Sequence, residues 1–219
     1  TTDRRGGSIT ISGSESLVRN CDIYNYTHQG PEKVVLGAAG LPVTKGARVA
    51  WCRIYNNRST RTHGTTQAGG VCVDNATIEN SVISNNTCAT KNDVNVSGAG
   101  GVLLNSKGVI RNSLVVRNSC VNSFSSGVIA LSNSQVINCT IASNGTASCI
   151  HYGGLYAKSS YVTNTIVSGN LSVKGEFYNS QSTFGYCCVP REVTGEGNIV
   201  ATPIFRNPGE GDFTLRGRQ

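Results

Sequence analysis

Two short segments near the start of the chain carry side chains that could hold a sugar. Asp22 and Tyr24 lie two residues apart, and the same spacing recurs at Arg53 and Tyr55. Stacked tyrosines offer aromatic faces and a charged pair offers hydrogen bonds, and an acidic polysaccharide could use both. The alternative interpretation is that the tyrosines are ordinary neighbours on adjacent strands and that the charges are solvated.

A repeated element must bring these two segments together. Residues 68–88 and 99–120 follow one plan, in which two glycines precede a short apolar run and then two asparagines six residues apart. Aligned on the first asparagine position, six copies follow one another at intervals of 26 to 32 residues. A continuous period of this length is typical of repeat proteins.

The apolar residues of the copies fall into columns. One column is Val18, Val49, Ile78, Ile110, Val136 and Val162, and another is Ile23, Ile54, Ile83, Val115, Ile141 and Val167. Short strands that each turn one such column inward stack into parallel sheets with a spacing of about 4.8 Å. The sequence therefore predicts one all-β domain over residues 1–219, a right-handed single-stranded parallel β-helix (solenoid) of about six rungs. The regular rungs are expected at about 6–170, with an irregular C-terminal segment at 171–219 that packs along the coil.

Asparagine recurs at two positions of the repeat, and we expect both to be corners of the coil. An inward amide can bond the corner backbone and the equivalent asparagine one rung away. The first predicted ladder is Asn20, Asn80, Asn112, Asn138 and Asn164. The second is Asn57, Asn86, Asn118, Asn144 and Asn170. Trp51 interrupts the first ladder, where we expect a bulge or an exposed ring.

The chain has nine cysteines, and none forms the C-x-x-C pair that is typical of zinc sites. Cys21, Cys52 and Cys139 fall in a column of small inward residues. Cys88 and Cys120 each follow a second-ladder asparagine on neighbouring rungs, a spacing that suits a disulfide, so we predict a bridge between them. This cysteine usage favours an extracellular or cell-surface location.

The net charge and the hydropathy of the chain limit the kinds of partner that it could bind. The formal net charge of +7 suits an acidic polysaccharide or an anionic cell surface, but no nucleic-acid motif accompanies it. No apolar run is long enough to span a membrane. The sequence predicts no metal site and no cofactor.

Apolar residues also occur where side chains should face water. Val82, Leu114, Val116 and Ile166 are expected to point outward on one sheet, and Cys72, Leu103, Ile129 and Tyr156 on another. Exposed stripes of this kind are liabilities, so either the C-terminal segment or another copy of the chain should cover them. Together with a first rung that has no capping helix, they predict self-association into oligomers or filaments.

The units "GGVLLNSKGVIRNSLVVRN" and "GGVCVDNATIENSVISNN" resemble the β-helix repeats of bacterial surface proteins related to pectate lyases. The closing "NIVATPIFRNPGEGDFTL" is similar to the ending of choice-of-anchor Q surface proteins, although Ala201 stands where those proteins usually have an aspartate. The resemblance covers nearly the whole chain. It implies the β-helix fold, and this scaffold carries lyases, hydrolases, adhesins and structural fibres.

A lyase on this scaffold would need grouped carboxylates for Ca²⁺ and a Lys or Arg base on one outer face. The outward column beside the tyrosines has one acid, Asp22, and Glu79 is expected to pair with Arg111 on the next rung. We therefore predict no catalytic residues, and a non-catalytic structural or adhesive role comes first. The alternatives are a polysaccharide lyase or hydrolase and a glycan-binding module. Ca²⁺ would be needed only if the lyase alternative holds.

Overall fold

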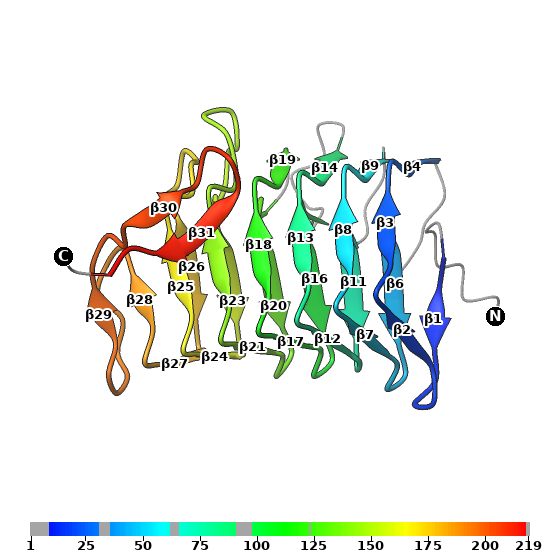
Figure 1. Cartoon of the computed structure of the whole chain (residues 1–219), viewed down its shortest axis with the longest axis horizontal. Coiled ribbons are helices and arrows are strands. Elements are labelled where there is room, and N and C mark those ends of the chain that lie inside the picture. The colour runs from blue at the N-terminus through cyan, green and yellow to red at the C-terminus, as the bar shows by residue number, and fades with distance from the viewer. Residues whose placement is uncertain (1–8, 31–35, 62–65, 91–97, 123, 218–219) are drawn as a thin grey trace.

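The computed structural model describes residues 9–30, 36–61, 66–90, 98–122 and 124–217. The chain winds through short strands, and each rung lies beside the equivalent strands of the rung before it, as Figure 1 shows. The stacked strands pair in parallel, which establishes the predicted all-β parallel solenoid. No α-helix occurs in this part of the chain, so it contains none that could cross a membrane.

Three long sheets form the walls of the coil. Sheet 1 contains β1 (Ile11–Ser12), β6 (Leu41–Thr44), β11 (Val71–Asp74), β16 (Val102–Asn105), β20 (Val128–Leu131), β23 (Leu155–Lys158) and β26 (Phe177–Ser180). Sheet 2 contains β2 (Leu17–Arg19), β7 (Arg48–Ala50), β12 (Thr77–Glu79), β17 (Val109–Arg111), β21 (Gln135–Ile137), β24 (Tyr161–Thr163) and β27 (Thr183–Gly185). Sheet 3 contains β3 (Asp22–Tyr24), β8 (Arg53–Tyr55), β13 (Val82–Ser84), β18 (Leu114–Val116), β22 (Thr140–Ala142), β25 (Ile166–Ser168), β28 (Cys188–Val189) and β29 (Ile199–Val200).

The walls enclose one continuous core. In sheet 2 the inward column runs through the register partners Val49, Ile78 and Ile110, all of which are fully buried. β-Branched side chains suit these positions because they pack well on a pleated surface. Both apolar columns predicted from the sequence belong to this core, with Val18 half-buried at its edge.

The regular coil continues past residue 170, where the sequence predicts an irregular segment. β26, β27 and β28 extend sheets 1, 2 and 3 by one more rung. This rung lacks the glycine pair that stands at 69–70, 100–101 and 153–154, and it fills the core with Phe177 and Phe184, whose ring centroids lie 5.9 Å apart. The backbone therefore forms one more rung here, although the sequence of this rung lacks the residues that mark the other copies.

Two smaller sheets form a side lobe. Sheet 4 contains β4 (Thr27–Gly30), β9 (Arg58–Arg61), β14 (Thr87–Thr90) and β19 (Ser119–Val121), and sheet 5 contains β5 (Leu36–Ala38), β10 (Thr66–Ala68) and β15 (Gly98–Ala99). Alanines of sheet 5 pack with the outward residues of sheet 1 in a second apolar cluster. Cys72, Leu103 and Ile129 are buried there, so the prediction that this stripe faces water is wrong. The sequence missed the cover because sheet 5 consists of short segments of small residues.

The chain ends in an antiparallel hairpin of β30 (Phe205–Asn207) and β31 (Asp212–Leu215), which lies across the outer face of sheet 3 in Figure 1. Phe213 packs against Val116 and Leu114, and Arg117 donates hydrogen bonds to carbonyls of the hairpin turn. The hairpin thus covers Leu114 and Val116 of the other predicted stripe, with Val116 buried and Leu114 half-buried. Val82 and Ile166 of that stripe are half-buried as well.

Candidate functional site

The predicted aromatic pair lies on the first two strands of sheet 3. The rings of Tyr24 and Tyr55 stack with centroids 5.0 Å apart and planes 3° apart. Arg53 Nε donates to Asp22 Oδ1 at 2.7 Å, and a second guanidinium nitrogen bonds the other carboxylate oxygen. This bidentate bond lowers the pKa of Asp22 and raises that of Arg53. The pair therefore satisfies its own charges, and each tyrosine face inside the stack is already covered.

The second predicted asparagine set forms a buried ladder. Asn118 Nδ2 donates to Asn144 Oδ1 and to the backbone carbonyl of Ile83, each at 3.0 Å, and Asn86 repeats the pattern toward Asn118. All five side chains, Asn57, Asn86, Asn118, Asn144 and Asn170, take part in it. Glu176 ends the ladder, because its Oε2 accepts from the backbone N–H of Asn170 at 2.9 Å.

The glycine pairs of the repeat exist because of this ladder. A Cβ added at Gly101 would lie 2.9 Å from Asn118 Nδ2 and 2.8 Å from the carbonyl oxygen of Gly127. Gly70 is in the same position against Asn86. The glycines therefore let the strand approach the corner where the amides lie.

The first predicted asparagine set does not form an inward ladder, so that prediction is wrong. Its members have positive φ values of 48° to 55° and stand at the corner between sheets 2 and 3, with Asn80 half-buried and the others exposed; the set is Asn20, Asn80, Asn112, Asn138 and Asn164. Asparagine tolerates this left-handed conformation better than most residues. One side-chain bond links two members, from Asn138 Nδ2 to Asn112 Oδ1 at 3.1 Å.

The residues after Asn80, Asn112, Asn138 and Asn164 are buried and bond the corner backbone as the ladder was expected to do. Cys21, predicted to lie in the same inward column, is exposed on the first rung. Ser113 Oγ accepts from the backbone N–H of Ser81 at 3.1 Å and donates to the carbonyl of Arg111 at 2.8 Å. Cys52, Cys139 and Thr165 continue this column of small buried side chains. The corner between sheets 2 and 3 is therefore held by hydroxyls and thiols, and its amides stay outside.

Trp51 occupies the asparagine position of the second rung. Its φ is 52°, and the residue is 59% exposed, so the expected exposed ring is present. A bulky residue with positive φ is strained, and such outliers concentrate at functional sites. No described aromatic ring stacks on the indole.

Trp51 marks one end of a shallow groove that runs along this corner. The groove has a volume of about 570 Å³ and draws on four successive rungs; it is lined by Trp51, Asn80, Ser81, Val82, Asn112, Ser113, Leu114, Asn138 and Thr140. Three asparagine amides form one side at the rung spacing of about 4.8 Å. Val82 and Leu114, which the sequence placed on a self-association stripe, supply apolar contact surface. None of the lining side chains is ionisable.

Charge lies next to the groove on sheet 2. Glu79 is almost fully buried between Arg48 and Arg111, and Arg111 Nε donates to Glu79 Oε2 at 2.7 Å. Burial alone would raise the pKa of Glu79, but the hydrogen bonds and charges of the two arginines outweigh it and hold the pKa below its usual value. The expected pair of Glu79 and Arg111 is thus part of a three-residue bridge across three rungs.

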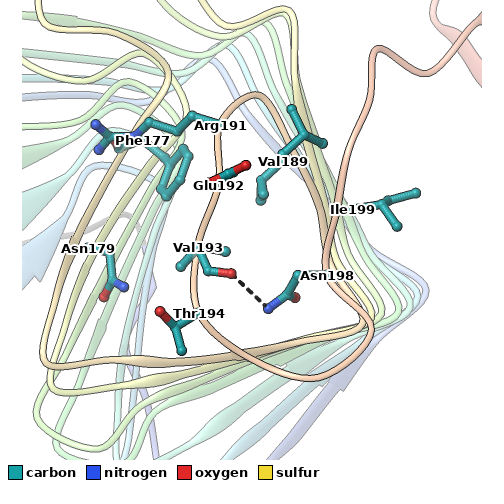
Figure 2. Close-up of a pocket in the computed structure, with 10 residues that line it drawn as sticks. Phe177, Asn179, Val189, Arg191, Glu192, Val193, Thr194, Asn198 and Ile199 are labelled. Atoms are coloured by element: carbon teal, nitrogen blue, oxygen red, sulfur yellow. Dashed lines mark hydrogen bonds between the residues drawn. The ribbon is translucent and has the colours of Figure 1, made fainter.

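A second cavity of about 610 Å³ lies at the end of the coil (Figure 2). Residues 190–198 cross this end, and Val193 packs against the core. Asn198 Nδ2 donates to the carbonyl of Val193 at 3.4 Å, and Arg191 donates to that of Phe177 at 3.0 Å. These hydrogen bonds fix residues 190–198 over the end of the coil. We therefore interpret the cavity as space beneath this capping segment and not as a ligand site.

The structure has an aromatic cluster that the sequence did not reveal. Tyr156, predicted to lie on an exposed stripe, stacks on Tyr178 with centroids 4.7 Å apart, and the cluster is completed by Phe124, His151 and Tyr152. Tyr156 is therefore half-buried among rings. The register of sheet 1 places Tyr178 next to Tyr156, but the sequence analysis ended the regular rungs before Tyr178.

The structure describes all nine cysteines, Cys88 and Cys120 of the predicted disulfide among them. The two residues are register partners on β14 and β19, where neighbouring side chains run parallel and do not converge as a disulfide requires. Within the described residues, no group of three His, Cys, Asp or Glu side chains is placed to hold a metal ion.

No protein-family model matches the chain, and no curated protein matches it either. Among solved structures, the chain is similar to QnrB1, a plasmid-mediated fluoroquinolone resistance protein, at 11% sequence identity and a TM-score of 0.28. That alignment covers 89% of this chain and 90% of QnrB1. A TM-score this low adds nothing to the fold that the strand pairing establishes.

Proposed function

We propose that this chain is a non-catalytic, extracellular carbohydrate-binding protein that holds a polysaccharide along the corner groove. Trp51 carries the proposal, because a large exposed ring occupies a strained backbone position that asparagine fills in the five other aligned copies and that Tyr186 fills in the last rung. Backbone strain of this kind clusters at functional sites. An indole is also the best of the aromatic faces for a sugar ring to stack on.

The rest of the groove supplies the chemistry that a sugar chain needs. Amides of Asn80, Asn112 and Asn138 offer both donors and acceptors to hydroxyl groups, and they recur along the direction in which a polymer would lie. Val82 and Leu114 would contact the apolar faces of the rings. Since no ionisable side chain lines the groove, recognition rests on hydroxyls, and the net charge of +7 only raises the local concentration of an acidic chain.

We also propose that the chain is related to the pectate-lyase-like surface proteins that it resembles, and that it acts outside the cell. The exposed Asp22 and Arg53 are committed to each other, so neither is available as a free acid or base. The proposal therefore predicts binding without turnover.

Affinity electrophoresis and calorimetry against pectin, alginate and neutral plant and bacterial glycans test the proposal. Trp51→Ala is expected to weaken binding by about tenfold, or about 1.4 kcal/mol, the size of one lost aromatic contact. Tyr161→Ala is the matched control, because Tyr161 is an exposed ring on sheet 2 that does not line the groove. Binding through the groove should survive raised salt, which screens charges and leaves stacking intact.

Two results would overturn the proposal. Equal effects of Trp51→Ala and Tyr161→Ala would place binding elsewhere, and no binding to any glycan would remove it. Release of shortened or unsaturated products, with or without Ca²⁺, would favour the lyase or hydrolase alternative.

A second candidate is a structural role through self-association, and one observation favours it. The two outer strands of sheet 3 carry exposed apolar side chains, Tyr24 on β3 and Ile199 and Val200 on β29. Head-to-tail contact of these unlike ends would extend the sheet from copy to copy. Sedimentation at rising concentration tests it: Ile199→Lys should abolish association, and a monomer at every concentration would exclude it.

A further inference from the structure

Three cysteines meet at the end of the side lobe. Cys88 and Cys120 lie in register on β14 and β19, and Cys149 comes from the next rung. All three are fully buried. Cys120 Sγ lies 2.9 Å from Cys149 Sγ, closer than unbonded sulfur atoms usually approach, whereas an S–S bond measures about 2.05 Å.

The surroundings of the pair favour Cys149 over Cys88 as the partner of Cys120. Cys149 faces β19 from a separate segment, so its side chain converges on Cys120, whereas Cys88 and Cys120 are parallel neighbours on one sheet. Ser126 Oγ lies 3.3 Å from the sulfur atoms of both Cys120 and Cys149, so one hydroxyl contacts both thiols.

We propose that Cys120 and Cys149 form a disulfide when the chain folds in an oxidising compartment. The oxidant is a small disulfide such as oxidised glutathione. The Cys149 thiolate attacks one of its sulfurs and releases one thiol; Cys120, after losing its proton, then attacks the Cys149 sulfur and releases the second. Two protein thiols are thereby oxidised to one disulfide, and the small disulfide is reduced to two thiols. Because both sulfurs are buried in the folded chain, the reaction takes place before the coil closes.

The bridge would fix the segment that carries part of the aromatic cluster. The carbonyl of Cys149 accepts from the N–H of Val173 at 2.9 Å, and its Sγ lies 3.7 Å from the carbonyl oxygen of Tyr152. His151, two residues later, stacks on Phe124, and Tyr152 contacts Tyr156 with the ring planes tilted by 50°. A covalent link at Cys149 therefore holds these rings against sheet 1.

Peptide mapping of the full chain tests the inference without any variant. The protein is refolded with reduced and oxidised glutathione, alkylated in denaturant without reductant and digested with chymotrypsin, since residues 121–148 contain no Lys or Arg for trypsin. Fragment spectra should show Cys120 joined to Cys149 and not to Cys139, with the other seven of the nine cysteines alkylated. Reduction should lower Tm by roughly 6 to 12 °C.

Two variants sharpen the assignment. Cys88→Ser should keep the bridge and the drop in Tm on reduction, whereas Cys149→Ser should lose both and leave Cys120 alkylated. A link between Cys88 and Cys120, or alkylation of both Cys120 and Cys149 in the parent chain, would overturn the proposal.

Discussion

Asparagine stands at two corners of this coil, buried at one and exposed at the other. Asn86 and Asn118 lie at the corner between sheets 3 and 4, where their amides bond backbone carbonyls and each other. Asn80 and Asn112 stand at the corner between sheets 2 and 3, with their side chains directed into the groove that Trp51 ends. The residue type and the spacing are the same.

The difference is one of position within the turn. Each corner has a residue with positive φ followed by an inward polar residue: Asn85 then Asn86 at one corner, Asn80 then Ser81 at the other. The inward residue satisfies the backbone, and the left-handed residue points away from the core. At the corner between sheets 2 and 3 the repeating asparagine is therefore the left-handed residue, and at the corner between sheets 3 and 4 it is the inward one.

The largest expected loss of stability comes from a change in the buried asparagine ladder. Asn118→Leu removes the acceptor of two bonds from Asn86 and leaves the carbonyl of Ile83 without its side-chain donor, so we expect a loss of about 2 to 4 kcal/mol of unfolding free energy. Asn112→Leu, its partner on the exposed row, should cost about 1 kcal/mol, the strain of leucine in a left-handed turn. Chemical denaturation of both variants measures the gap, and equal losses would contradict the comparison.

The next effect tests whether hydroxyls hold the exposed corner. Ser113→Ala removes the acceptor for the N–H of Ser81 and is expected to cost about 1 to 2 kcal/mol. Ser113→Thr should be nearly neutral, because Thr165 fills the same place two rungs away. Thermal melts of the two variants check this, and an alanine variant as stable as the threonine variant would show that the hydroxyl column is dispensable.

Glu79 gives the exposed corner a dependence on pH. Its pKa is held low in the folded state, so its contribution is complete above the ordinary carboxyl value of about 4.3 and is lost as the pH falls through the folded value. Glu79→Gln should cost about 1 kcal/mol at neutral pH, since both arginines remain partly solvated, and should flatten the acid side of the stability curve. Unfolding free energies between pH 2 and pH 7 compare the two chains. An unchanged acid slope would remove Glu79 from this role.

The smallest effect has the opposite sign. Trp51→Asn returns the favoured residue to a left-handed position, so stability should rise by about 0.5 to 1 kcal/mol. Binding of a glycan should fall in the same variant. A loss of stability would mean that Trp51 serves the fold.

The fold could be predicted from the sequence because the apolar columns repeat with the asparagines, and those columns fill the core. The buried ladder followed from the same repeat. The exposed row could not be told from a ladder, because sequence spacing alone does not separate a left-handed residue from the inward residue beside it. The cover of Leu103 by short alanine segments, and the approach of Cys149 to Cys120 from another rung, depend on where loops return in space.

Side-chain amide signals in an NMR titration test the central claim most directly. With an oligosaccharide drawn from whichever glycan binds the chain, we predict shifts of the Trp51 indole and of the Asn80, Asn112 and Asn138 amides, and none of the buried Asn86 and Asn118 amides. Shifts confined to Tyr24 and Tyr55, or spread equally over both asparagine rows, would contradict the account.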